Sequence, residues 1–296
     1  MSVESPESSV QGRPIKRGFH PSALDPRPST ASGAFTLIEL LVVISILGIL
    51  AALTVPALKN FGKSDVNISA SRQLLDGVAR ARQLAISQRT TVYMVFVPTN
   101  FWNIFGTKNL NLPWFNPLTF AQKTAATNLC GEQLSGYSFV ASGAMGDQPG
   151  RHAWHYLAPW QTLPDGAFIA LIKFTDSPAQ YHTVTDTIDA GRFFNIYGFS
   201  VTNTIPFPTE TSTNGVSLPY IAFDYRGQLV SGRDEYIPLA HGSVLPAIDP
   251  NTRALQFGPP DVLEMPPGNS TNIAYNIVHI DWLTGRAVLE SHKMGP

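Results

Sequence analysis

Residues 35–58 constrain this chain more than any other stretch, because 24 consecutive residues carry a single charged side chain, Glu39. Fifteen of them are Phe, Leu, Ile or Val. A helix needs about 20 apolar residues to cross the hydrocarbon core of a bilayer. These side chains favour insertion by roughly 5–9 kcal/mol, whereas one acidic residue opposes it by up to about 3.5 kcal/mol. The run therefore predicts a membrane-spanning helix, in which Glu39 needs a functional reason.

Three other interpretations of the same run compete with a functional membrane helix. A cleaved secretory signal has a similar basic start, but its apolar part usually covers only about 7–15 residues. A plain signal anchor fits the length of the run and leaves the carboxylate of Glu39 without a role. A buried core helix of a globular domain is the third interpretation, and the near-unbroken hydrophobicity of the run on all sides argues against it.

The residues before the run predict its orientation. Residues 1–32 are rich in Ser and Pro, show no apolar periodicity, and have a composition typical of a disordered segment. Positive charges beside a span hold that side in the cytoplasm. We therefore expect the N-terminus in the cytoplasm and the C-terminal part in the periplasm. The basic residues are Arg13, Lys16, Arg17 and Arg27.

The string FTLIEL at residues 35–40 resembles the prepilin motif of type IV pilins and type II secretion pseudopilins. In that family a membrane-bound prepilin peptidase cuts before the Phe and N-methylates the new amino terminus. The Glu is the fifth residue of the mature chain, and Glu39 holds that position when counting starts at Phe35. The same count places Pro56 at mature position 22, where many pilins have a helix-kinking proline.

The cleavage site is the one place where the motif departs from the family pattern. The family usually has Gly before the Phe, whereas this chain has Ala34, with Gly33 before it. We expect cleavage between Ala34 and Phe35, because this bond keeps Glu39 in its usual place; cleavage after Gly33 is the alternative. The resemblance further implies N-methylation of Phe35, and pairing of its amine with Glu39 of a neighbouring subunit.

The rest of the sequence predicts an α+β, pilin-like fold with four segments. These are a leader (1–34), a transmembrane or filament-core helix (35–58), an amphipathic helix (59–89) and a β-rich periplasmic head (90–296). Within the amphipathic helix, residues 64–88 repeat apolar side chains at spacings of three and four. The apolar positions are Leu74, Leu75, Val78, Ala81, Leu84, Ala85 and Ile86.

The head sequence predicts several strands. Thr90–Val97 is rich in β-branched and aromatic residues, and two hairpins are predicted, one over residues 220–230 and one over residues 273–290 with Gly285 in its turn. The helix followed by these strands resembles GspH/FimT-like minor pseudopilins. Residues 98–165 predict an aromatic-rich insertion. Gly166–Phe174 predicts a further strand, and the polar, Pro-rich segments 175–217 and 242–270 predict loops.

No candidate for catalysis or metal binding stands out. His152 and His155 lack a third ligand, and Asp186 with Asp189 falls short of the six to eight oxygens that calcium requires. We predict no enzyme activity, no cofactor and no metal site.

Without residues 1–34 the chain has 16 basic and 18 acidic residues, which argues against nucleic acid as a partner. The single cysteine, Cys130, predicts a small buried apolar residue.

Together these features predict a minor pseudopilin, a structural subunit of a type II secretion pseudopilus in the inner membrane and then in a periplasmic filament. The implied partners are prepilin peptidase, other pilin or pseudopilin subunits, an inner-membrane assembly platform and, before assembly, membrane lipid. A minor type IV pilin is the nearest alternative. A membrane-anchored periplasmic binding protein that never assembles, and an exported protein with a cleaved signal, are the others.

Overall fold

The structure, a computed structural model, describes residues 36–99, 115–143, 147, 153–185, 193–213, 215–248, 259–270 and 276–291. For residues 53–65 and 291 it describes the backbone alone. The chain forms two compact units, residues 1–53 and residues 54–296. The long helix α1 (Leu37–Gln88) has residues in both, and the second unit, the head, contains all the strands.

The head portion of α1 buries one face, as its apolar periodicity predicts. Ala70, Leu74, Val78, Ala81 and Ala85 are fully buried, and their spacings of three and four place them on one stripe of a helix. The helix ends at Gln88, as predicted. One predicted core position is wrong: Ile86 is 41% exposed, because it lies about 100° around the helix from the buried Ala85.

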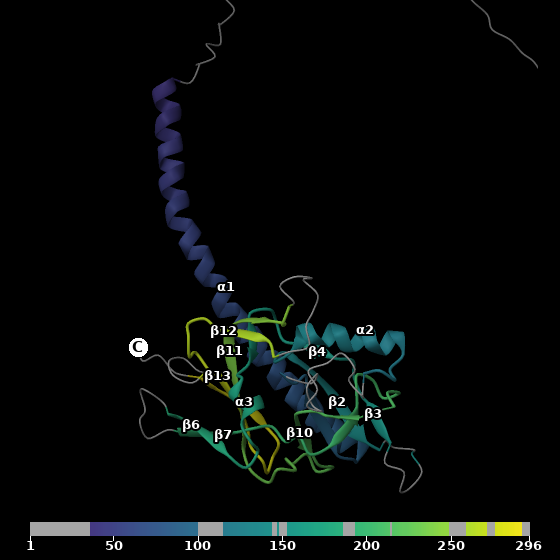
Figure 1. The fold of residues 1–296 in the computed structure, drawn as a ribbon. Coiled ribbons are helices and arrows are strands. Elements are labelled where there is room, and N and C mark those ends of the chain that lie inside the picture. Colours follow the sequence, from purple (N-terminus) through teal and green to yellow (C-terminus); the bar gives the residue numbers. More distant parts are fainter. Residues whose placement is uncertain are drawn as a thin grey trace, which may run out of the picture. The chain divides into compact units, whose positions relative to one another are not determined.

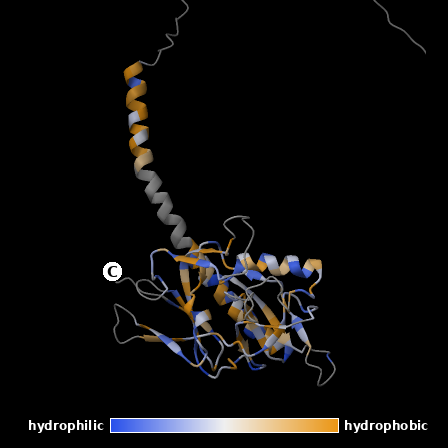
Figure 2. Ribbon diagram, in the orientation of Figure 1, coloured by the Kyte–Doolittle hydropathy of each residue, from blue (hydrophilic) through white to orange (hydrophobic). Residues whose placement is uncertain are grey.

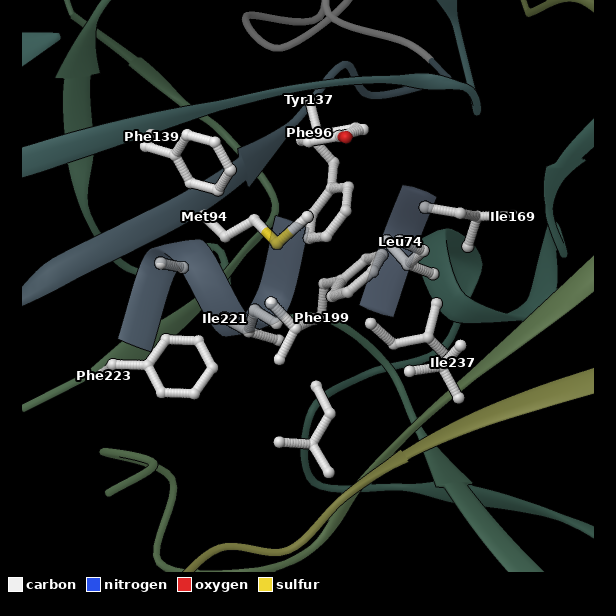
Figure 3. Packing of buried hydrophobic residues seen from close by; sticks show 14 of the residues in the cluster. Leu74, Met94, Phe96, Tyr137, Phe139, Ile169, Phe199, Ile221, Phe223 and Ile237 are labelled. Atoms are coloured by element: carbon white, nitrogen blue, oxygen red, sulfur yellow. The ribbon is translucent and has the colours of Figure 1, made fainter. Parts of the chain in front are cut away.

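The first antiparallel sheet has the strand order β10-β1-β2-β3, and β4 also pairs with β2. One face of this sheet packs on α1, and its residues Met94, Phe96 and Phe139 lie in the same buried cluster as Leu74 (Figure 3). The alternate residues, among them Val95 and Val140, face a second apolar cluster. The strands are β1 (Val92–Phe96), β2 (Gly136–Ser142), β3 (Trp154–Tyr156), β4 (Gln161–Thr162) and β10 (Tyr220–Phe223).

Short elements supply the partner residues on that second face. Helix α2 (Phe120–Asn128), the 3₁₀ turn η2 (Leu129–Glu132) and the ribbon of β8 (Thr204–Pro206) and β9 (Gly215–Ser217) contribute to its cluster. Trp154 and Trp160 pack against the same cluster. Cys130 lies within it at 3% exposure, which confirms the interpretation of this cysteine as a buried apolar residue.

The second antiparallel sheet has the order β12-β11-β13-β14, and β5 also pairs with β11 (Figure 1). Ile237, Leu239 and Val278 pack in the same cluster as the α1 stripe, so the helix contacts both sheets. On the other face, Ile277 packs against the ribbon of β6 and β7. The strands are β5 (Ala167–Ile169), β6 (Tyr181–Thr185), β7 (Phe193–Tyr197), β11 (Glu235–Leu245), β12 (Asp261–Glu264), β13 (Asn276–Ile280) and β14 (Ala287–Ser291).

The long helix and the antiparallel sheets confirm the predicted α+β, pilin-like class. The strand predicted over residues 90–97 is β1, and the second predicted hairpin is β13–β14 with Gly285 at a φ of 62°. In the first predicted hairpin, β10 turns at Gly227 (φ 81°), and the returning strand is reduced to a bridge between Phe223 and Leu229.

Three predictions for the head are wrong or incomplete. The strand predicted over residues 166–174 stops at Ile169, and the short helix α3 (Ile172–Thr175) follows. The predicted loops over 175–217 and 242–270 hold β6 to β9, β12 and the end of β11. Most of these strands are short and mix polar residues with a few apolar ones, so their composition resembles that of a loop; β7, with the sequence FFNIY, is the exception. The segment predicted as an insertion also contributes β2, which pairs with β1 within the first sheet.

Candidate functional site

The first turn of α1 is built around Thr36 and Glu39. The backbone N–H of Glu39 donates to the carbonyl oxygen of Thr36 at 3.1 Å and lies 3.3 Å from its Oγ1. Thr36 thus acts as an N-cap, and the spacing Thr-x-x-Glu is that of a capping box. The carboxylate of Glu39 also lies at the positive end of the helix dipole, which favours a negative charge there.

The helix that follows this turn is apolar on every side. The large apolar side chains from Leu37 to Ile49 are 45–81% exposed, and the hydrophobic colouring encircles this part of α1 (Figure 2). The hydroxyl of Ser45 donates to the carbonyl oxygen of Leu41 at 2.7 Å, so this polar group is satisfied within the helix. A helix that is hydrophobic all round needs an apolar environment supplied from outside its own chain, by lipid or by other helices.

Glu39 is the charged group of this apolar segment, defined here as residues 37–49. Among the residues that the structure describes, no ion pair or side-chain hydrogen bond reaches its carboxylate. An ionisable group in an otherwise apolar helix is therefore the candidate functional group of this chain.

The head holds a buried ion pair that the sequence does not reveal. Lys173 Nζ lies 2.6 Å from Glu235 Oε2, and the two side chains are 0% and 6% exposed. Lys173 also donates to the carbonyl oxygen of Tyr197 at 2.8 Å, and its ammonium lies 4.9 Å from the centre of the Phe199 ring. Burial lowers the pKa of Lys173, while the carboxylate of Glu235 opposes that change. The pair joins α3 to β11.

The remaining predicted positions are placed only in part. Ala34, Phe35 and Gly33 lie outside the described residues. Pro56 lies within α1, where the structure describes the backbone alone, so the predicted kink stays a prediction.

The histidine and aspartate positions that we considered for a metal give no site in the described part of the chain. His155 Nε2 lies 2.9 Å from Asp147 Oδ2, and His155 Nδ1 lies 3.9 Å from Glu210 Oε2. His152, Asp186 and Asp189 lie outside the described residues. Among those described, no group of three or more His, Cys, Asp or Glu side chains could hold a metal ion.

Comparison with known proteins bears on the segment around Glu39. Residues 30–55 match the model of the prokaryotic N-terminal methylation motif. The chain therefore carries the motif of type IV pilin-like subunits, which a prepilin peptidase processes and which assemble with other pilin subunits. Such subunits are membrane-anchored export substrates with a structural role.

No curated protein and no solved structure matches the chain. Within the described residues, no helix combines the length and the apolar character that crossing a membrane requires.

Sequence reasoning missed the cap and the buried pair for different reasons. Thr36 and Glu39 are three residues apart, so the capping box is visible in the sequence once the start of the helix is known. Lys173 and Glu235 are 62 residues apart. Lys173 lies between the apolar residues Ile172 and Phe174, which is a weak local signal, whereas Glu235 directly follows Arg233 and Asp234 and has none.

Proposed function

We propose that this chain is a minor pseudopilin, a structural subunit of a type II secretion pseudopilus. The observation that carries the proposal is the exposed apolar helix with Glu39 in its first turn, inside a match to the N-terminal methylation motif. Prepilin peptidase would cut between Ala34 and Phe35 and methylate the new amine. The segment would lie in the inner membrane before it joins the filament.

Glu39 would act in assembly through charge pairing. The amine of Phe35 is positive after cleavage, and a charge in an apolar filament core is costly unless an opposite charge lies beside it. The carboxylate of Glu39 would supply that charge to the neighbouring subunit. Because a shift of one helical turn would separate the two charges, pairing would favour one register between subunits over all others.

The choice of a pseudopilin over a type IV pilin rests on two features of the head. The order of the helix, the strand β1, the turn at Gly227 and the hairpin of β13 and β14 resembles that of GspH/FimT-like subunits. Many type IV pilins hold their C-terminal region with a disulfide, whereas this chain has one cysteine. The filament in which the chain is found, a pseudopilus or a surface pilus, separates these two functions.

The mass of the mature N-terminal peptide tests the proposal. We expect a peptide that starts at Phe35 and carries one methyl group on its amine. Cells that lack the prepilin peptidase serve as the control and should yield the peptide that starts at Met1. A start beyond Ala51 in normal cells would identify an ordinary secretory signal, and retention of Met1 there would identify a plain anchor. Either result would refute the proposed function.

A further inference from the structure

The ribbon of β6 and β7 turns one face toward the core of the head and the other face outward. Val184, Phe194 and Ile196 are buried on the inner face, where they form one cluster with a residue of β13. Figure 1 shows the ribbon at the margin of the head. Because side chains alternate between the two faces of a strand, the residues between the buried ones form the outer face. We call it the ribbon face, and its residues are Tyr181, Thr183, Thr185, Phe193, Asn195 and Tyr197.

The ribbon face has aromatic rings at both ends and neutral polar groups at its centre. Its cross-strand pairs, taken in order along the ribbon, are Tyr181–Tyr197, Thr183–Asn195 and Thr185–Phe193. Tyr181 is 55% exposed and Phe193 is 61% exposed. At a rise of about 3.4 Å per residue, Phe193 and Tyr197 place the two aromatic ends about 14 Å apart. A ligand that contacts both ends must therefore be long and must lie along the ribbon.

The centre of the ribbon face offers hydrogen bonds to such a ligand. Thr183 Oγ1 donates to Asn195 Oδ1 at 3.1 Å, which uses the carbonyl oxygen of the amide and leaves its two N–H donors. In the part of the chain that the structure describes, no hydrogen bond engages these N–H groups. The side chain of Thr185, on the same face, is exposed as well. The centre can thus donate and accept hydrogen bonds without carrying a charge.

One aromatic end is held in place by Arg233. The guanidinium carbon of Arg233 lies 3.8 Å from the centre of the Tyr197 ring, and the centres of the Tyr197 and Tyr181 rings are 5.4 Å apart. Arg233 Nη2 also donates to the carbonyl oxygen of Pro178 at 2.6 Å. The rings are therefore ordered before a ligand arrives, so binding would cost little side-chain entropy.

The charges around the ribbon face disfavour nucleic acid and anionic lipid as ligands. None of its residues, all of which the structure describes, is charged. Arg233 adjoins one end, and its Nε lies 3.8 Å from the buried carboxylate of Glu235. Nucleic acid and anionic lipid surfaces are bound through several basic side chains that act together. One guanidinium beside a carboxylate does not supply such a patch.

The order of the side chains also disfavours a protein partner. Protein interfaces place their aromatic anchors at the centre of the contact and surround them with a polar rim. The ribbon face has the reverse order, because Thr183 and Asn195 lie at its centre and the rings of Tyr181 and Phe193 lie at its ends. The ligand should therefore have apolar faces that recur along its length and polar groups between them.

A polysaccharide has this chemistry. Each pyranose ring has a face of C–H bonds and a rim of hydroxyl groups. The C–H bonds are attracted to the face of an aromatic ring, where its quadrupole is negative. The hydroxyl groups exchange hydrogen bonds with neutral amides and hydroxyls, which are the groups at the centre of the ribbon face.

We propose that the ribbon face binds an extended, uncharged polysaccharide strand. Sugar rings stack on Tyr181 and Phe193, and the sugar between them accepts hydrogen bonds from the amide of Asn195. Because the ribbon face is straight, it favours a glycan with an extended chain over one that coils. This inference goes beyond the proposed function, since a filament subunit and an anchored protein that never assembles would present the same face.

Calorimetric titration of the full chain in detergent with sugars of equal length tests the site. Chitohexaose and cellohexaose have extended chains, whereas maltohexaose coils. We expect at least one extended sugar to bind, at least about tenfold more tightly than maltohexaose. Binding of neither extended sugar, or equal binding of maltohexaose, would overturn the proposal.

Variants at the two ends of the ribbon face locate the binding. Tyr181→Ala and Phe193→Ala should each weaken it by about tenfold, because each removes a ring on which a sugar stacks. The matched controls remove rings of similar or greater exposure elsewhere on the head: Tyr225→Ala (54% exposed) and Phe120→Ala (87% exposed). Both controls should bind like the unchanged chain. Unchanged affinity in Tyr181→Ala/Phe193→Ala would show that the sugar binds elsewhere and would overturn the proposal.

Two further variants keep the test decisive if alanine destabilises the ribbon. Tyr181→Phe keeps the aromatic ring and should bind like the unchanged chain. Tyr181→Leu keeps an apolar side chain without the ring and should bind as weakly as Tyr181→Ala. Equal affinities of these two variants would refute stacking on this ring. The mass of the mature N-terminal peptide reports on the proposed function alone, so either proposal can fail while the other stands.

Discussion

Two portions of α1 have the same helical backbone but differ in how their apolar side chains are covered. From Leu37 to Ile49 the large apolar side chains are exposed on every side, whereas from Ala70 to Ala85 the apolar residues form one buried stripe. The first portion finds no cover in its own unit, and the second is covered by two sheets. The head therefore has a complete core of its own, while the apolar segment depends on what surrounds it.

The same contrast holds for the charges of the two regions. Glu235 in the head has Lys173 at 2.6 Å, so its charge is balanced inside the chain. Glu39 in the apolar segment has no such partner among the described residues. A carboxylate in apolar surroundings needs a counter-charge wherever it resides. Glu39 is therefore the group whose partner we expect on another molecule.

The largest effect is expected from Glu39→Gln. Glutamine keeps the shape of the side chain and can serve at the third position of a capping box, so the helix should start as before. The variant should insert in the membrane and be methylated normally, but its amount in filaments should fall by at least about tenfold, since a buried charge of the neighbour would be left unpaired. Immunoblots of sheared filament fractions measure this amount.

The matched control is Ser45→Ala in the same segment, which removes a hydroxyl that bonds only within the helix. It should assemble like the unchanged chain. Normal incorporation of Glu39→Gln would show that Glu39 serves the helix cap and dipole alone, and the comparison of the two carboxylates would then fail.

Lys173→Met probes the carboxylate that is paired within the head. Removing Lys173 leaves the buried carboxylate of Glu235 with only the longer contact to Arg233 Nε at 3.8 Å, and we expect the free energy of unfolding to fall by about 3–5 kcal/mol. Adding Glu235→Leu should restore part of this loss, because no charge then stays buried. Urea unfolding of the full chain in detergent, followed by tryptophan fluorescence, measures both. A loss below about 1 kcal/mol for the single variant would contradict a tightly coupled pair.

A pair of leucine variants tests the comparison of the two helix portions directly. Leu74 is fully buried and Leu47 is 58% exposed. Leu74→Ala should lower the free energy of unfolding of the head by about 2–5 kcal/mol, through lost burial and a cavity. Leu47→Ala should change it by less than about 0.5 kcal/mol. Equal losses in the same urea experiment would show that the apolar segment is part of the head's cooperative core.

Local patterns of sequence predicted the parts of the fold that depend on one element. The buried stripe of α1, the strand β1 and the turn at Gly285 each follow from residues within a few positions of one another. The ribbon of β6 and β7 could not be predicted in this way. Only Val184 is buried in β6, and its packing partner Ile277 is far along the chain.

The candidate site shows the same division. Glu39 was predicted because an isolated charge in an apolar run is visible without a structure. The buried pair of Lys173 and Glu235 was not, because the two residues meet only after α3 has packed beside β11. Residues that act through non-local contacts have a sequence signal only where their residue type is unusual for the element that carries them.

The smallest effect is expected from Tyr156→Phe, which concerns the response of the head to alkali. Burial raises the pKa of Tyr156, as it does for Tyr93 and Tyr137, and the Tyr156 hydroxyl donates to the carbonyl oxygen of Pro206 at 2.7 Å. At neutral pH the variant lacks this hydrogen bond, so its free energy of unfolding should be lower by about 1 kcal/mol. The apolar segment has no tyrosine, so this response belongs to the head alone.

The sign of the pH effect follows from the direction of the shift. A tyrosine in the unfolded chain ionises near pH 10, whereas the buried one stays protonated, so the stability that it contributes is complete below about pH 10 and falls as pH rises further. Each such tyrosine lowers the free energy of unfolding by about 1.4 kcal/mol per pH unit in that range. Tyr156→Phe removes one of these ionisable groups, so the free energy of unfolding of the variant should fall less steeply with pH than that of the unchanged chain. The two chains should therefore become more alike in stability above pH 10. Parallel slopes for the two chains, from urea unfolding at pH 9 to 11, would show that Tyr156 ionises freely in the folded head.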